Sequence, residues 1–347
     1  MSLNFPISNK IYITSDVHGG IDLLKKHVSR VSDDSYLFII GDLIEKGADS
    51  LSTLRYIYEL SKKPNVFVTI GNNDYEFLRS LEIENLEFFS KRINNPTSII
   101  NQLRIELKED NPEKLQRLIK EKLKNEINFL KTLNTYYIVE DFLLVHAGIN
   151  KNGLLESSFK DKTRLNNFYN LGHNEDYIVI CGHYPTSMYV LDKYDNNVII
   201  DLNKKIICID GGYAATNMGQ LNLLEITKTK DGYKYQTYSE DSFEKILIEE
   251  NQDGYGNSRG ICFPNFEIEI LKKDIYFSKV KVIQTGEIMF IKNEMIANVK
   301  EKYYSIDDCP NNFLEVVKGE VVSLIFNDYE GYRLIKKNGI CGWIKKL

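Results

Sequence analysis

The chain has 347 residues, of which 43% are hydrophobic and 27% are charged, a balance typical of a globular protein with a large core. Its formal net charge of −5 argues against a nucleic-acid or anionic-membrane ligand, because phosphate surfaces favour basic proteins. The five cysteines form no Cys-x-x-Cys pair, and we find neither a signal pattern nor an apolar run of about 20 residues, so we expect a cytoplasmic protein with reduced thiols.

In residues 10–72, short apolar runs alternate with amphipathic helical patterns. The apolar runs are typical of buried strands, and the helical segments have apolar residues three and four positions apart. The second helix should begin at Asp49 or Ser50 and end before Pro64. The expected elements are strands at 10–16, 35–42 and 65–72, and helices at 20–31 and 48–63. This alternation predicts a layered α/β core.

Residues 76–135 differ in composition from the segments on either side. They are charged and helical, with an interruption at Pro112, and this pattern is typical of a solvated helical insertion. The alternative is a lid over a functional site, because insertions of this kind follow the ends of strands. Apolar strand patterns return after the insertion, at 136–148, 177–183, 204–212 and 220–227.

From about residue 238 the pattern changes to short strands separated by Gly, Asn and Asp, with no convincing helix. The segments 277–295 and 332–347 both contain a strand, a glycine turn and a second strand with an Ile-Lys pair. We therefore predict one domain over 1–237 and an all-β region over 238–347. The weak repeat divides the second region into modules at about 240–296 and 297–347.

Metal-ligating side chains follow five of the predicted strands. A single histidine at a strand end is more commonly a hydrogen-bonded structural residue, but here the donors recur at strand after strand. Ligands gather at the carboxyl ends of strands in open α/β sheets, so we expect the donors to converge. Mixed oxygen and nitrogen donors suit borderline divalent metals, and six are too many for one open zinc site. The predicted ligands of two metals that share a carboxylate are Asp16, His18, Asp42, Asn72, His146 and His183.

The sequence blocks around these donors resemble a known family. "SDVHGG", "GDLIEKGADS", "GNND", "VHAGI" and "CGHYPT" are similar, in order and spacing, to the blocks of calcineurin-like metallophosphoesterases. The resemblance covers roughly residues 10–230 and is nearest to the PPP-type enzymes, which include bacterial Ser/Thr protein phosphatases and symmetrical diadenosine tetraphosphatases. It implies a β-sandwich flanked by helices, in α/β/β/α layers, for residues 1–237.

The resemblance also implies roles for the donors. Asp16 and His18 would hold the first metal, Asp42 would bridge both, and the remaining three donors would complete the second site. Manganese is the expected metal, with iron or zinc as alternatives. A hydroxide between the metals would attack a phosphoester or phosphoanhydride. The expected substrate is a phosphoprotein or a nucleotide-like molecule such as a dinucleoside polyphosphate.

Three linked positions depart from the family pattern. Asn73 stands where the family usually has a general-acid histidine, Glu45 where it has the aspartate that orients this histidine, and Lys46 where it has a phosphate-binding arginine. An amide cannot deliver a proton at neutral pH, and general acid help is typically worth about 10²–10⁴-fold in rate. The departure therefore favours substrates with good leaving groups, unless His173 or Asp74 supplies the proton.

Phosphate binding is expected from Lys46, from Asn72 and from Arg164, which falls where the family commonly has a second phosphate-binding arginine. The alternative for Arg164 is an ordinary surface residue. The changed general-acid position also leaves a second hypothesis open, in which the protein is a catalytically weakened phosphatase that acts as a binding protein.

The end of the chain has a resemblance of its own. Residues 302–347 are similar to a bacterial SH3-like domain, with a turn at Gly339 and a terminal Gly-Trp-Ile. This resemblance implies one or two SH3-like barrel modules in the C-terminal region, and a peptide ligand for them. Trp343, the single tryptophan of the chain, is expected either in the core or as an aromatic wall of a peptide groove.

Overall fold

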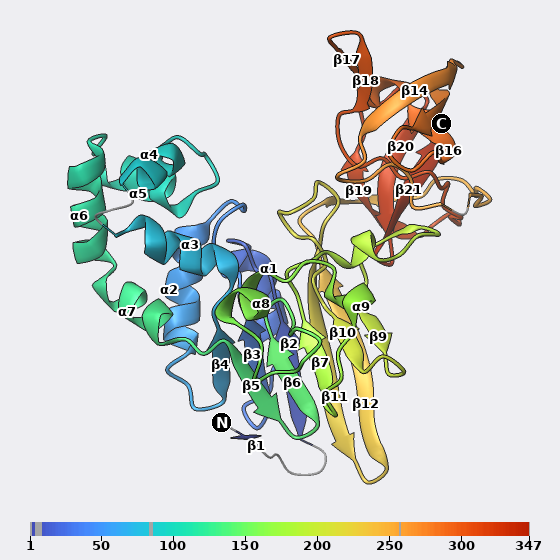
Figure 1. The fold of residues 1–347 in the computed structure, drawn as a ribbon. Coiled ribbons are helices and arrows are strands. Elements are labelled where there is room, and N and C mark those ends of the chain that lie inside the picture. The colour runs from blue at the N-terminus through green and yellow to red at the C-terminus, as the bar shows by residue number, and fades with distance from the viewer. Residues whose placement is uncertain (1, 4–8, 83–85, 257, 347) are drawn as a thin grey trace. The chain divides into compact units, whose positions relative to one another are not determined.

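The computed structural model describes residues 2–3, 9–82, 86–256 and 258–346 (Figure 1). The chain folds into two compact units. The first comprises residues 1–185, 198–215 and 221–240, and the second comprises residues 186–197, 216–220 and 241–347. The chain thus passes into the second unit twice before its final entry, and each unit is described by itself below.

Two β-sheets form the centre of the first unit. The six-stranded sheet has the order β1 (Ser2–Leu3), β5 (Tyr136–Val139), β6 (Phe142–Val145), β7 (Ile178–Cys181), β10 (Ile206–Cys208) and β9 (Ile199–Asp201). The five-stranded sheet has the order β12 (Gly232–Glu240), β11 (Leu221–Thr229), β2 (Lys10–Thr14), β3 (Tyr36–Ile40) and β4 (Val66–Thr69). Strands β2, β3 and β4 run parallel to one another, as do β6, β7 and β10, so the residues that follow them leave each sheet at one edge.

The apolar strands that the sequence predicts are buried on both faces. Between the sheets, Ile13, Phe38 and Ile180 belong to one fully buried cluster. On the opposite face of the five-stranded sheet, Tyr12 and Ile39 pack with the helices in a second cluster. Because side chains alternate along a strand, a strand between two apolar layers needs a continuous apolar run. The mixed α/β sandwich expected from the sequence is confirmed.

Among the described residues, two α-helices pack on the five-stranded sheet, five lie in the segment between β4 and β5, and two lie between β6 and β7. In chain order they are α1 (Ile21–Val28), α2 (Ser50–Leu60), α3 (Asn72–Ser80), α4 (Leu86–Ile93), α5 (Ile99–Leu107), α6 (Pro112–Lys122), α7 (Lys124–Thr132), α8 (Phe159–Arg164) and α9 (Phe168–Leu171). Asp49 caps α2 by accepting a hydrogen bond from the Ser52 amide. Pro112 is the first residue of α6 and follows the cap Asn111, a position where the missing N–H has no helical partner to lose.

Helices α3 to α7 form the expected insertion, which returns to the sheet close to where it leaves. The amide of Ile70, just after β4, donates to the carbonyl of Asn134 at 3.0 Å, and Thr69 pairs with the same residue. The two ends of the insertion are therefore joined beside the sheet edge.

The second unit is all-β, as the sequence predicts, and has two five-stranded sheets. The first has the order β13 (Glu244–Leu247), β19 (Val321–Phe326), β20 (Tyr332–Lys337), β21 (Ile340–Lys345) and β8 (Tyr194–Asp195). The second has the order β16 (Ile288–Lys292), β15 (Phe277–Val282), β14 (Glu267–Lys272), β18 (Lys302–Ser305) and β17 (Ile296–Val299).

These pairings do not divide the region near residue 296. Strand β13 joins the sheet built from the end of the chain, and β17 and β18 join the sheet of β14 to β16. Trp343 is fully buried, and its indole N–H donates to the Pro310 carbonyl at 2.8 Å. Of the two places expected for Trp343 the structure shows the core, so this side chain cannot line an open peptide groove.

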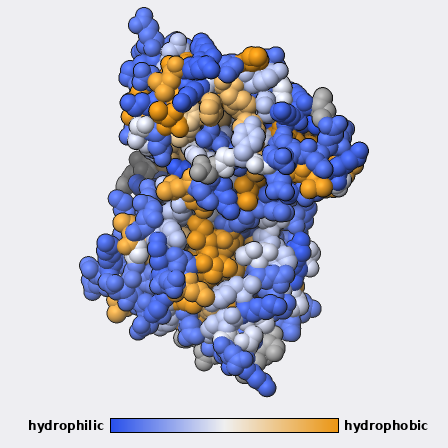
Figure 2. Space-filling view, turned by 90° about the vertical axis from the view of Figure 1, so that its right-hand side faces the viewer, coloured by the Kyte–Doolittle hydropathy of each residue, from blue (hydrophilic) through white to orange (hydrophobic). Residues whose placement is uncertain are grey.

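On the face drawn in Figure 2, hydrophilic residues cover most of the surface and hydrophobic residues gather in separate patches. Across the described ranges, none of the helices combines the length and the apolar composition that a membrane span requires.

Candidate metal centre

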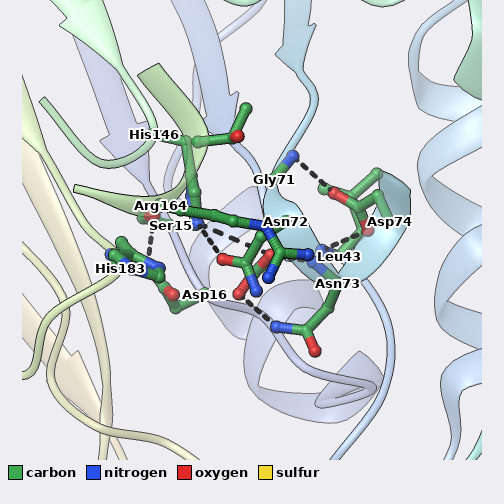
Figure 3. Close-up of polar contacts among 12 residues, drawn as sticks. Ser15, Asp16, Leu43, Gly71, Asn72, Asn73, Asp74, His146, Arg164 and His183 are labelled. Carbon is green, nitrogen blue, oxygen red and sulfur yellow. Dashed lines mark hydrogen bonds and ion pairs between the residues drawn. The ribbon is translucent and has the colours of Figure 1, made fainter. Parts of the chain in front are cut away.

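The six predicted ligands converge at the ends of five strands of the first unit. Strand β2 leads into Asp16 and His18, β3 leads into Asp42, and β4 leads into Asn72. In the other sheet, β6 leads into His146 and β7 leads into His183. Figure 3 shows the side chains of the labelled ligands Asp16, Asn72, His146 and His183 turned toward one another. The strand-end positions that suggested a site in the sequence therefore lie together in the fold.

Asp42 belongs to two groups of candidate ligands. In one group, Asp42, Asp16 and His18 bring one ligand atom each within 4.8 Å of one another, and in the other Asp42 does so with His146 and His183. Its Oδ2 lies 3.6 Å from His18 Nε2, and its Oδ1 lies 3.5 Å from His146 Nε2. One carboxylate thus presents one oxygen to each group, which is the arrangement that two neighbouring cations need.

The amide of Asn72 lies among acceptor atoms of the second group. Its Oδ1 lies 3.2 Å from His146 Nε2 and 2.8 Å from His183 Nδ1. If the amide nitrogen of Asn72 faces the two rings, it donates hydrogen bonds to His146 Nε2 and His183 Nδ1. If the amide oxygen faces them, that oxygen and the two ring nitrogens offer three lone pairs to the same place. The second arrangement fits a bound cation, so the donor set suits a divalent metal.

Hydrogen bonds of the ring nitrogens orient two of the histidines. His18 Nδ1 lies 3.2 Å from the Ile44 carbonyl, and His146 Nδ1 lies 2.9 Å from the Ile40 carbonyl. A backbone carbonyl on Nδ1 holds the proton there and leaves Nε2 as the free lone pair. Both histidines consequently turn an unprotonated Nε2 toward Asp42.

The backbone at the site is strained. Asp16, His18, Asp42 and His183 have φ values of 55°, 44°, 51° and 66°, in the left-handed region that residues with a side chain rarely adopt. Each such residue costs on the order of 1–2 kcal/mol. The loops hold one another in this form, since the Asp16 amide donates to the Gly41 carbonyl at 3.1 Å and the His18 amide donates to the Asp42 carbonyl at 3.0 Å. The ligands are therefore set in place by the fold.

Two glycines permit the close approach of these loops. A Cβ on Gly71 would lie 2.1 Å from the Asp42 amide nitrogen, and a Cβ on Gly182 would lie 2.2 Å from Asp16 Oδ2. Any side chain at either position would push a ligand out of place. The glycines beside Asn72 and His183 in the sequence blocks thus have a steric reason.

The pKa values of the candidate ligands indicate that the site lacks positive charge. Burial and the neighbouring Asp42 raise the pKa of Asp16 to about 7. Burial lowers the pKa of His18 and of His183 to about 3, so both rings stay neutral near pH 7. Burial opposes the ionisation of Asp42, but neighbouring groups such as the Lys46 ammonium and the Asn73 backbone N–H favour the carboxylate and hold the pKa of this carboxyl low. Neutral imidazoles around buried carboxylates are the ligand set of a divalent cation.

Asn73 is a donor to the shared carboxylate. Its backbone N–H donates to Asp42 Oδ1 at 2.8 Å, and its side-chain Nδ2 donates to Asp42 Oδ2 at 2.6 Å. Both contacts stabilise the ionised form of Asp42. In this arrangement Asn73 positions the carboxylate, and its amide has no proton to give to a leaving group.

Glu45 is bound on the side of the insertion. Its Oε1 lies 2.8 Å from the Arg92 guanidinium of α4, 3.3 Å from the Ile99 amide and 3.4 Å from the Ser98 hydroxyl at the start of α5. Only 6% of the Glu45 side chain and 14% of the Arg92 side chain are exposed. The orienting role expected for Glu45 stays a prediction, and the carboxylate that would perform it is engaged by Arg92.

The expected phosphate-binding cations border the ligands. Lys46, with a φ of 65°, places its Nζ 3.1 Å from His18 Nε2. Arg164, at the end of α8, pairs with Glu76 of α3, and 36% of its side chain is exposed. Figure 3 shows Arg164 reaching across Asn72. Arg164 borders the ligand groups, and its role in phosphate binding stays a prediction.

Neither of the other proton donors considered from the sequence is placed to protonate a leaving group. Asp74 is fully buried, and its two oxygens accept from the Leu43 amide at 2.9 Å and the Gly71 amide at 2.8 Å. His173 Nε2 lies 3.0 Å from the Lys205 carbonyl, and the ring stacks on Phe168. Both residues hold backbone segments in place.

A sandwich with imidazole, carboxylate and amide donors grouped about one shared aspartate at its strand ends defines the class of metal-dependent phosphoesterases. The family model described as calcineurin-like phosphoesterase matches residues 9–207, so the chain belongs to this family. The family predicted from the sequence blocks is confirmed, and with it a requirement for divalent metal.

Two curated relatives are named symmetrical bis(5'-nucleosyl)-tetraphosphatase. The chain is 36% identical to that of Buchnera aphidicola subsp. Schizaphis graminum (strain Sg) over 119 residues, which are 30% of this chain and 42% of the relative. It is 37% identical to that of Legionella pneumophila (strain Lens) over 70 residues, which are 19% of this chain and 25% of the relative. The chain therefore spans less than half the length of these relatives.

A solved structure of a cold-active protein-tyrosine phosphatase from a psychrophilic Shewanella species is 18% identical, with a TM-score of 0.42. The match covers 68% of this chain and 81% of that one.

Proposed function

We propose that the protein hydrolyses a phosphoanhydride or a phosphoester with a good leaving group, using two divalent ions, with manganese foremost. Asp16 and His18 would hold one ion, Asn72, His146 and His183 the other, and Asp42 both. When bound, the two ions would lower the pKa of an attacking water and offset the charge of the phosphate. The observation that carries the proposal is the shared Asp42, with one oxygen toward each ligand group.

The other residues of the site would orient the substrate. Lys46 and Arg164 provide positive charge on two sides of the ligands, where they can contact phosphate oxygens that the ligand groups leave open. Lys46 acts as a point charge, whereas a guanidinium such as that of Arg164 can bind two oxygens at once. Arg164 would exchange its contact with Glu76 for the phosphate on binding.

The substrate preference follows from the missing proton donor. Asn73 donates to Asp42, Asp74 is consumed by two amides and His173 binds a backbone carbonyl, so none of the three protonates a leaving oxygen. A phosphoanhydride leaves as a stable anion without that proton, whereas a serine alkoxide does not. The names of the curated relatives, which act on a polyphosphate between two nucleosides, agree with this preference.

The test compares three substrates with manganese present: diadenosine tetraphosphate, p-nitrophenyl phosphate and phosphoserine. We expect turnover of the first two and much slower turnover of phosphoserine. The matched control is Asp42→Asn, which keeps the shape but removes the shared charge, and which should lower kcat by at least about 10²-fold. Elemental analysis should find two ions per chain in the wild type and one or none in Asp42→Asn.

A different outcome would favour the binding-protein hypothesis. If wild-type protein retains metal but hydrolyses all three substrates no faster than Asp42→Asn, the site binds phosphate without turning it over. This alternative is supported by Asn73, which stands where the family usually has the general-acid histidine.

We also propose a cytoplasmic location. All five cysteines are buried and free, and Cys181 Sγ lies 3.9 Å from Cys208 Sγ without a bond. Such a pair is expected where thiols stay reduced. Fractionation of the native host with detection of this chain would test the location, and recovery outside the cytoplasm would refute it.

A further inference from the structure

A cavity of about 620 Å³ lies next to the metal centre in the first unit, between α3, α7 and the first residue of α8. Its volume is within the range of about 300–1,000 Å³ that is usual for small-molecule sites. Nothing in the chemistry described so far uses it. Its walls have two distinct parts, one apolar and one cationic.

The apolar part contains an aromatic pair. Tyr75 of α3 and Phe159 of α8 have ring centroids 4.6 Å apart at an interplanar angle of 58°, and 40% of Phe159 is exposed. Behind them the wall is formed by buried residues such as Ile127 and Leu130 of α7. An exposed aromatic ring over an apolar wall provides a stacking surface for a flat aromatic group.

The cationic part surrounds this surface. Among the described residues, four cations line the cavity, namely Arg79, Lys120, Lys124 and Lys131, together with one acid, Glu82. The described part of the lining therefore has a formal charge of +3, four less one, on a chain whose net charge is −5. Because a local charge opposite to the whole protein concentrates anions, the cavity is complementary to an anionic ligand.

A row of charged side chains connects the cavity to the metal centre. Glu76 of α3 pairs with Arg164 at the ligands and lies 3.7 Å from Arg79 in the cavity wall. The same two helices border both places: α3 begins with Asn72 and has Tyr75 three residues later, and α8 begins with Phe159 and ends with Arg164. At a rise of 1.5 Å per residue, Tyr75 lies roughly 5 Å from Asn72 along the axis of α3, and Phe159 lies roughly 8 Å from Arg164 along the axis of α8.

We propose that this cavity is a second subsite of the same active site, which binds the nucleoside end of a nucleoside polyphosphate. The base would stack at Phe159 and Tyr75, the lysines of α6 and α7 would contact the distal phosphates, and the scissile phosphate would lie at the metal centre. The inference rests on the proposed hydrolysis and specifies its substrate as a molecule with an aromatic base and a chain of phosphates.

Steady-state kinetics with two substrates tests the subsite. We compare Lys124→Ala/Lys131→Ala with Lys114→Ala/Lys122→Ala, a double variant that removes the same charge from lysines paired with Glu109 and Glu106 outside the cavity. The first variant should raise KM for diadenosine tetraphosphate by about 3- to 30-fold, as expected for two partly screened contacts to phosphate. KM for p-nitrophenyl phosphate, which has no distal phosphates, should stay within about twofold in both variants. Equal effects of the two double variants, or no effect, would overturn the proposal.

A binding measurement separates this inference from the proposed function. Calorimetric titration with ATP and with tripolyphosphate, in EDTA, reports the cavity without turnover or metal. Tyr75→Leu and Phe159→Leu keep apolar volume but remove the rings. Each should weaken the binding of ATP by about 5- to 100-fold, as expected for a lost stacking contact, and should weaken the binding of tripolyphosphate less. A protein without hydrolysis that still shows these differences would refute the proposed function alone. Normal hydrolysis with equal loss of both ligands, or with no loss, would refute the subsite.

Discussion

The buried pair of Glu45 and Arg92 gives a prediction that can be worked out from its contacts. Arg92→Met keeps the length of the side chain but leaves the Glu45 carboxylate, 6% exposed, with only the bonds of 3.3 Å from Ile99 and 3.4 Å from Ser98. Breaking a buried ion pair by removing one partner costs about 3–5 kcal/mol. Burial already raises the pKa of Glu45, so partial protonation offsets some of this cost.

We therefore expect Arg92→Met to lower the free energy of unfolding by about 2–4 kcal/mol at pH 7.5. Glu45→Gln should also destabilise, because it leaves the guanidinium without its charge partner. The double variant removes both charges, so it should be less destabilised than the sum of the two, with a coupling of about 2 kcal/mol. Urea unfolding with linear extrapolation measures all three variants, with Lys91→Met, a surface neighbour on α4 whose side chain is 71% exposed, as the control.

The same pair should affect catalysis through the neighbouring Lys46. Glu45 and Lys46 are consecutive left-handed residues, with φ values of 72° and 65°, so releasing one carboxylate frees the strained segment that places the lysine. We expect Arg92→Met to lower kcat/KM for p-nitrophenyl phosphate by about tenfold, a misplacement effect, with the metal content unchanged. A coupling energy under 0.5 kcal/mol, or stability loss with normal kinetics, would refute the reasoning.

Three further predictions concern other residues. Asn73→His should speed alkyl phosphate hydrolysis more than aryl phosphate hydrolysis, but by less than the full 10²–10⁴-fold because Arg92 occupies the Glu45 carboxylate; equal effects on both substrates would point to another proton source. Burial lowers the pKa of His27 to about 4 from 6.5, so the unfolded state takes up a proton first and wild type should lose about 3 kcal/mol more stability than His27→Gln between pH 6.5 and pH 4; parallel pH profiles in urea titrations would contradict this. Trp343→Ala should destabilise the second unit by about 3–5 kcal/mol, and the buried indole of wild type should resist iodide quenching; strong quenching would show an exposed ring instead.

The donors at the strand ends could be predicted because each follows from local sequence. Apolar runs mark the strands, parallel strands end at one edge, and polar residues such as Asp16 or His183 directly after a run must lie there. The shared role of Asp42 was implied instead by the family resemblance of the sequence blocks, because strand order alone does not say which donor is shared. The insertion was recognisable by its charge, which contrasts with the apolar runs on either side.

Contacts between distant segments could not be predicted in the same way. Arg92 is one of several charged residues in a helical stretch, and nothing in its neighbourhood marks it as the partner of Glu45, 47 positions earlier. The pairing of β13 with β19 likewise joins segments about 75 residues apart that any of several similar strands could have matched. Local pattern specifies which face of an element is apolar, whereas the partner of that face depends on the whole fold.

The closed base of the insertion has a consequence for how this protein can diversify. The backbone pairing of Ile70 and Thr69 with Asn134 joins the two ends of the insertion. The entropic cost of closing the insertion therefore depends little on its length, because each doubling of the length adds only about 0.6 kcal/mol. Helices α4 to α7 can therefore be lengthened, shortened or exchanged as one cassette during evolution, while Asn72 keeps its place at the end of β4. Homologous chains with the same donors would then differ chiefly in this cassette, and with it in the molecules that they accept.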